Sequence, residues 1–261
     1  MSLTITGARS ELGRLLAAHD TRANVHINVA GQQANTLLHD GHAWKDFNRT
    51  AVAGARRAAR ADASMLVHAS FAFVVTEPAH DPLRSLAQTI HECESIVLAA
   101  AIPACVVRLG YLYGPTSRDL RAYRSAFQLG RPYWAGPRDT LQYHLHSDDA
   151  ISALLAAAKT RHAGKTFYAT DGTPVAFMQF MDDFARKWGR RRPLHVPRIA
   201  APLMRLVVRK EHVQQCDHIV PARAPKPSVP GWKPVHADYR LCQDEIIAQW
   251  GARPRARSTS A

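Results

Sequence analysis

Three residues near the beginning of the chain have the types and spacing to bind an anion. Gly7, Ser10 and Gly13 follow a short apolar run and lead into a helical pattern. A glycine permits a tight turn there, and the free N–H groups at the start of a helix attract a negatively charged group such as a pyrophosphate. The pattern is G-x-x-G-x-x-G with a serine in the middle. An ordinary structural turn explains this pattern equally well.

The cysteines and histidines indicate a functional site less clearly than the glycine turn does. The four cysteines are scattered without a C-x-x-C pair: Cys93, Cys105, Cys216 and Cys242. Cys216 and His218 are too close in sequence to converge readily on one ion, so we expect no metal site. Tyr143, His144 and His146 crowd one short stretch. They either line a pocket or pack alternately as a strand does.

Apolar runs alternate with helical patterns along most of the chain, which predicts a parallel sheet covered by helices. The expected strands are residues 3–6, 25–30, 65–70, 105–109 and 165–169. The expected helices are residues 11–19, 44–61, 83–101, 118–130, 148–160 and 176–188.

The character of the sequence changes after residue 189, where prolines cluster around one apolar helical pattern at residues 199–208. A last helix is expected at residues 238–250, and the arginine- and serine-rich tail 252–261 is expected to be disordered. We therefore divide the chain into a nucleotide-binding-type domain, residues 1–170, and a small C-terminal lobe, residues 171–251, which is interleaved with it.

Composition excludes several classes of protein. Of the 261 residues 46% are hydrophobic and 21% are charged, which is ordinary for a globular protein. No run is apolar enough for a membrane span and no signal peptide is recognisable, so we expect a cytoplasmic location without membrane binding. The net charge of +13 comes from dispersed arginines without a nucleic-acid-binding motif. A small acidic or phosphorylated ligand is the expected partner, and a basic-surface interaction protein is an alternative.

Several segments occur in the order found in one known family. Residues 107–115 (VRLGYLYGP) are similar to its VRPxxVYGP segment, 146–150 (HSDDA) to HVDDVA, 167–174 (FYATDGTP) to YNVTDGEP, and 231–234 (GWKP) to GWxP; Asn48 with Ala58 and Ala59 resembles its NxxGTxxVLEAA helix. The chain thus resembles the extended short-chain dehydrogenases/reductases, the NAD-dependent epimerase/dehydratases.

This resemblance implies a Rossmann-like three-layer α/β fold with a small C-terminal substrate lobe, and NAD or NADP as cofactor. Carried onto this sequence, the cofactor contacts fall on Gly7, Arg9, Ser10, Glu11, Leu12, Gly13 and Ala30.

The resemblance also shows departures at the catalytic residues. The family uses Ser or Thr, Tyr and Lys, with the Tyr as general acid/base. Aligning Glu94 with the family's glutamate places Leu86 at the Tyr position and Ile90 at the Lys position, while Phe71 takes the serine position with Ser70 one residue before it. The arginine that grips a nucleotide-sugar diphosphate in the family is Gln142 here. The catalytic residues are therefore unknown, with His91, Tyr113 and His146 as substitute candidates.

The largest departure is a gap. The run at residues 25–30 resembles the family's fourth strand, but only one helix and a turn fit between Gly13 and Val25, although a βαβ unit needs about 30 residues. Strands two and three are therefore expected to be absent. In the strand order 3-2-1-4-5-6 their removal leaves the rest contiguous, with residues 3–6 as a new edge strand. That edge invites a homodimer or another partner.

The lost strands normally hold the adenosine half of the cofactor. We therefore predict a degenerate relative of the family that binds a nucleotide or small acidic metabolite with little or no hydride transfer. An active epimerase, dehydratase, reductase or isomerase with non-standard catalytic residues is the alternative.

Overall fold

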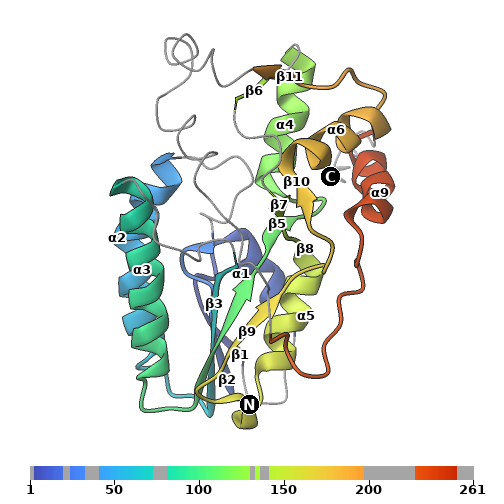
Figure 1. Cartoon of the computed structure of the whole chain (residues 1–261). Coiled ribbons are helices and arrows are strands. Elements are labelled where there is room, and N and C mark those ends of the chain that lie inside the picture. The colour runs from blue at the N-terminus through green and yellow to red at the C-terminus, as the bar shows by residue number, and fades with distance from the viewer. Residues whose placement is uncertain are drawn as a thin grey trace, which may run out of the picture.

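A parallel sheet of five strands forms the centre of the molecule (Figure 1). The computed structural model describes residues 3–19, 24–32, 41–72, 81–129, 133–135, 141–196 and 227–251. In their spatial order the strands are β1 (Leu3–Thr6), β2 (Val25–Asn28), β3 (Met65–Phe71), β4 (Ala104–Leu109) and β9 (Thr166–Ala169), and each neighbouring pair is parallel. This confirms the Rossmann-like sheet expected from the sequence.

The sheet is trimmed at one edge, as the gap in the sequence predicts. β1 pairs directly with β2, in a register that sets Leu3 opposite Val25 and Thr6 opposite Asn28. Within the described parts of the chain, no strand pairs with the outer side of β1. Among the described strands β1 is therefore the edge, and the two strands that lie beyond it in a complete doubly wound sheet are not found there.

Helices cover both faces of the sheet. α2 (Gly41–Ala58) and α3 (Asp81–Leu98) lie on one face, and α1 (Glu11–Leu16) and α5 (Ser147–Ala157) on the other (Figure 1). The completely buried Val67 and Val107 pack under α1 and α5. α1 is shorter than the predicted range 11–19, because the N–H groups of Ala18 and His19 bond to carbonyls only three residues back, which closes the helix as tight turns.

Beside the five-stranded sheet and its covering helices, the described chain forms three short strand pairs and three further helices. β5 (Tyr111–Tyr113) pairs with β8 (His144–His146), β6 (Tyr133–Ala135) with β11 (Leu194–Val196), and β7 (Leu141–Gln142) with β10 (Val175–Ala176). The helices are α4 (Arg118–Leu129), α6 (Phe177–Lys187) and α9 (Tyr239–Gly251), and the 3₁₀ turn η2 (Thr160–His162) precedes β9. The sequence does not predict these strands, because two or three residues are too few to show an alternating pattern.

Some predictions concern residues that the structure does not describe. The helix at residues 199–208, Cys216 and the tail 252–261 lie outside the described ranges. Among the described helices, none has the length and apolar character needed to cross a membrane.

Candidate functional site

The predicted glycine turn is present and closely packed. Gly7 directly follows β1 with φ +89°, a conformation that side-chain-bearing residues rarely adopt. A Cβ added to Gly7 would lie 2.8 Å from the backbone nitrogen of Ala30, and one added to Gly13 would lie 2.3 Å from the carbonyl oxygen of Gly7. The fold thus brings together Gly7, Gly13 and Ala30, three of the predicted contacts, and both glycines are needed for close backbone approach.

The start of α1 is nevertheless already occupied by its own side chains. The Ser10 hydroxyl accepts a hydrogen bond from the Gly13 N–H at 3.0 Å and donates one to the Gly7 carbonyl at 2.8 Å. Glu11 adds a carboxylate to the first turn, where the helix dipole favours negative charge, and Leu12 is buried in the core. Of the predicted contacts, Arg9 alone is an exposed cation.

These residues do not fit a complete dinucleotide. The serine hydroxyl takes one N–H group that a pyrophosphate would use, and the Glu11 carboxylate would repel a phosphate. The adenosine half would lie beyond β1, where no described strand carries a residue to hold its ribose. The turn can offer a small anion Arg9 and a few backbone N–H groups, which is a weak site.

A row of polar side chains crosses the face of the sheet under α2 and α3. His26 of β2 contacts the hydroxyls of Thr4 and Thr6 of the neighbouring β1 at 2.7 and 2.8 Å. Next to it, the Asn28 amide nitrogen lies 3.0 Å from Nδ1 of His68. Burial lowers the pKa of His68 to about 4. Such side chains alternate with apolar ones on each strand, so their row follows from the sheet register.

The row ends in a buried ion pair. Arg108 donates to both carboxylate oxygens of Glu94, at 2.9 and 2.7 Å, and to the Tyr168 hydroxyl at 2.7 Å. Ser70 donates its hydroxyl to Glu94 at 2.5 Å. Burial by itself raises the pKa of Glu94, but the hydrogen bonds and charge of Arg108, with the bond from Ser70, more than offset this and leave the pKa below its ordinary value. Glu94 is therefore an ionised structural anchor.

The positions to which the resemblance assigns the family's catalytic residues carry apolar side chains where the structure describes them. Phe71 is 3% exposed, and its ring meets that of Phe47 edge-on with centroids 5.4 Å apart. Ile90 is 2% exposed and lies in the same core cluster. Leu86 lies in α3, but its side chain is outside the described set. The hydroxyl of Ser70, the nearest alternative to the missing serine, is already bound to Glu94.

The substitute candidates do not form one catalytic group. The His91 side chain is 54% exposed, with its Nδ1 3.9 Å from Glu94. Tyr113 of β5 and His146 of β8 are buried, with ring centroids 5.3 Å apart. Tyr113 donates to Cys242 Sγ at 3.7 Å, and burial raises the pKa of its hydroxyl above the ordinary value. A phenol held in that way is a poor general acid/base at neutral pH.

His144 supports the packing alternative for residues 143–146. Its ring stacks on Phe180, with centroids 4.1 Å apart and planes 5° apart. The side chain is completely buried, and neither ring nitrogen has a hydrogen-bond partner among the described residues. Burial lowers the pKa of His144 to about 3. The ring is therefore a neutral core aromatic.

This burial predicts a pH effect. Because the folded-state pKa of His144 lies below the unfolded value near 6.5, protonation favours unfolding, and stability is lost as pH falls from about 6.5 toward 3. Between pH 7 and pH 5, the free energy of unfolding of His144→Phe is expected to fall by about 2 kcal/mol less than that of the unchanged protein. Urea unfolding at both pH values measures this. Phe180→Leu, across the stack, should lower stability equally at both; an unchanged pH dependence in His144→Phe would contradict the assignment.

The sequence does not predict the hydrogen bonds that link Asp149 to residues 235–236. The buried carboxylate of Asp149 accepts hydrogen bonds from the backbone N–H groups of Val235 and His236, at 2.9 and 2.8 Å, and lies 3.0 Å from His236 Nδ1. His146, Asp148 and His236 each have one nitrogen or oxygen atom that could bind a metal ion, and these three atoms lie within 4.8 Å of one another. The HSDD segment marks Asp149 as a candidate polar residue, but the residues that it binds are almost ninety positions away in the chain. These hydrogen bonds hold the segment before α9 against the start of α5.

Comparison with known proteins supports the fold. No protein-family model matches the chain. A curated 3-diazoavenalumate denitrifying reductase from a Streptomyces species is 28% identical over 156 residues, which is 59% of this chain and 50% of the relative, so the chain spans about half the length of this relative.

Solved structures extend the likeness to almost the whole chain. A human epimerase family protein with NADPH has a TM-score of 0.71 at 14% identity, covering 95% of this chain and 99% of that one. UDP-glucose 4-epimerase of Thermotoga maritima has a TM-score of 0.67 at 12% identity, covering 96% and 99%. A dTDP-glucose 4,6-dehydratase double mutant from Streptomyces venezuelae, with NAD bound, has 0.67 at 13% identity, covering 97% and 98%. The chain therefore has the Rossmann-like fold that these solved structures share.

Proposed function

We propose that this chain is a degenerate protein of the epimerase/dehydratase type, which binds at most a small acidic ligand weakly and transfers no hydride. One observation carries the proposal. The two described side chains at the positions of the family's catalytic serine and lysine, Phe71 and Ile90, are core residues with 3% and 2% exposure. Neither can donate or accept a proton. Restoring one of the polar groups there would bury it in an apolar core.

Two further observations support the proposal. Ser70, Glu94 and Arg108 use their polar groups on one another, so the hydroxyl nearest to the reaction position stabilises the fold. Among the described strands the sheet ends at β1, where the adenosine half of a dinucleotide would need further strands. The apolar catalytic positions and the short sheet are in separate parts of the fold, and both support a protein that transfers no hydride.

A reductase with other catalytic residues is the second candidate. It is favoured by the curated relative, which is a reductase that acts on a diazo compound. An active enzyme would have to hold a hydride donor without the two strands beyond β1, and its candidate acid is the exposed His91 of α3, whose Nδ1 lies 3.9 Å from Glu94.

A turnover assay distinguishes the two candidates. The full chain is incubated with NADPH or NADH and either UDP-glucose or an aromatic diazo acid, and coenzyme consumption and sugar products are measured. We expect neither to exceed the protein-free control, because the described residues provide no proton donor at the assigned serine and lysine positions and no further strand to hold the adenosine. Sustained turnover that falls at least about tenfold in Arg9→Glu or His91→Ala would establish the reductase or epimerase instead.

A further inference from the structure

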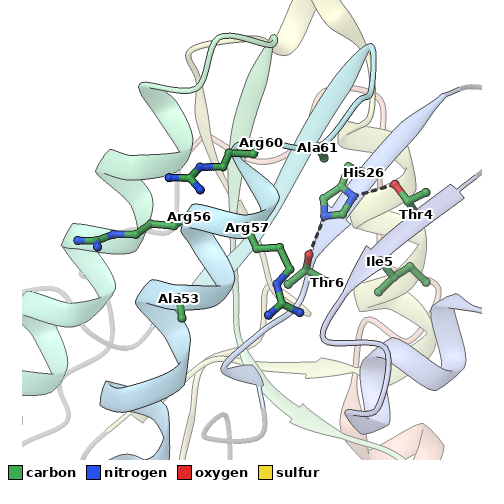
Figure 2. Close-up of a pocket in the computed structure, with 9 residues that line it drawn as sticks. All are labelled: Thr4, Ile5, Thr6, His26, Ala53, Arg56, Arg57, Arg60 and Ala61. Carbon is green, nitrogen blue, oxygen red and sulfur yellow. Dashed lines mark hydrogen bonds between the residues drawn. The ribbon is translucent and has the colours of Figure 1, made fainter.

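A groove follows the free edge of the sheet on the side of α2 (Figure 2). Its volume is about 730 Å³, and β1, His26 and the end of α2 line it. Three consecutive residues of β1 take part: Thr4, Ile5 and Thr6. Thr4 and Thr6 point to the α2 face, and Ile5 between them also lines the groove, although its side chain points to the opposite face. The groove therefore runs along β1, the strand that has no described partner on its outer side.

The backbone groups at this edge can pair with another strand. The Val29 N–H donates to the Thr6 carbonyl at 2.9 Å, so Thr6 directs its backbone toward β2. In a parallel ladder this direction alternates along the strand, so Leu3 and Ile5 turn their N–H and C=O groups away from β2. Within the described ranges no strand takes up these groups.

The two faces of this edge differ in chemistry. On the α2 face lie the hydroxyls of Thr4 and Thr6, both in contact with His26 (Figure 2). On the α1 face, Leu3 and Ile5 are partly buried and pack with Leu15 against the core. A strand added here would therefore meet a polar face on one side and an apolar face on the other.

The polar face is positively charged. Figure 2 shows Arg56, Arg57 and Arg60 on the α2 side of the groove, across from the threonines. Arg56 pairs with Glu92 of α3 at 3.6 Å. Arg57 and Arg60 are exposed, and no ionic partner for either is found in the described part of the chain. Within the described residues, two guanidinium groups without an ion-pair partner thus lie beside a strand edge that no other strand pairs with.

We propose that the β1 edge binds an extended segment of a partner protein in which acidic and apolar residues alternate. The segment adds a sixth strand, its backbone bonds to Leu3 and Ile5, its acidic side chains face Arg57 and Arg60, and its apolar ones cover the α1 face. A second copy of this chain is a poor occupant, because its own β1 carries no acidic residue and a twofold pairing would set arginine against arginine.

Fluorescence anisotropy with the full chain tests the proposal, using a labelled ten-residue peptide that alternates glutamate with valine. We expect saturable binding that weakens at least about tenfold in the Arg57→Glu, Arg60→Glu double variant, because both added charges repel the peptide. The matched control is the Arg161→Glu, Arg191→Glu double variant, which makes the same charge change at exposed sites elsewhere and should stay within about twofold. Both doubles alter surface residues, and circular dichroism checks their fold.

Hydrogen exchange then tests strand addition itself. Peptide binding should slow exchange of the Ile5 amide, while the Thr6 amide, which faces β2, serves as the internal reference. Unchanged exchange at Ile5 would overturn the proposal, as would equal binding of a peptide with the same residues in separate acidic and apolar blocks. Tighter binding of a single-stranded oligonucleotide that is lost in the Arg57→Glu, Arg60→Glu variant would identify a nucleic-acid site instead.

Discussion

Replacing Arg108 with methionine is expected to lower the free energy of unfolding by about 3–5 kcal/mol, because it leaves a buried carboxylate without its counter-charge. Arg108 supplies two hydrogen bonds to Glu94, whose side chain is 7% exposed, and a third to Tyr168. Methionine keeps much of the side-chain volume but none of the donors. Urea unfolding at pH 7 measures the change.

Two further variants separate the charge from the packing. Adding Glu94→Gln to Arg108→Met removes the stranded charge, so the double variant should be more stable than Arg108→Met alone. Arg56→Met breaks the exposed pair with Glu92 and should cost no more than about 1 kcal/mol. If Arg108→Met were as mild as Arg56→Met, Glu94 would not be the anchor described here, and Ser70 would be free for another role.

The sequence predicts the trimmed sheet well, because sheet order and chain order are linked. The short distance between Gly13 and Val25 excludes two strands and a helix, and the structure indeed pairs β1 with β2. The resemblance, anchored on Ser70 and Glu94, assigns Phe71 and Ile90 to the serine and lysine positions; the structure places both side chains in the core, and the assignment itself stays a prediction. These predictions depend on spacing along the chain, which one sequence contains.

Contacts between distant segments were not predictable in the same way. The polar row needs the register of five strands, which brings Asn28 beside His68 although forty positions separate them. The Ser10 hydroxyl that fills the start of α1 was read as a possible ligand contact, since a capping serine and a phosphate-binding serine have the same sequence signature. The groove beside β1 is also not predictable, because it forms between β1 and the end of α2, which are about fifty positions apart in the chain.

The second large effect concerns dinucleotide affinity. A complete site holds the pyrophosphate at the turn and the adenosine beyond β1, whereas this chain offers Arg9 and a turn that Ser10 and Glu11 already occupy. Each factor of ten in affinity corresponds to about 1.4 kcal/mol, so losing the adenosine contacts is expected to move the dissociation constant above about 1 mM. A dinucleotide should then bind no better than pyrophosphate alone.

Calorimetric titration of the full chain with NAD⁺, NADH, NADP⁺, NADPH and inorganic pyrophosphate is the most direct measurement of the central claim. We expect no saturation below about 1 mM for any of the five, and any residual heat to be equal for the dinucleotides and pyrophosphate and to vanish in Arg9→Glu. A dissociation constant in the micromolar range for one dinucleotide, not shared by pyrophosphate, would show that the chain holds the adenosine half after all and would contradict the account.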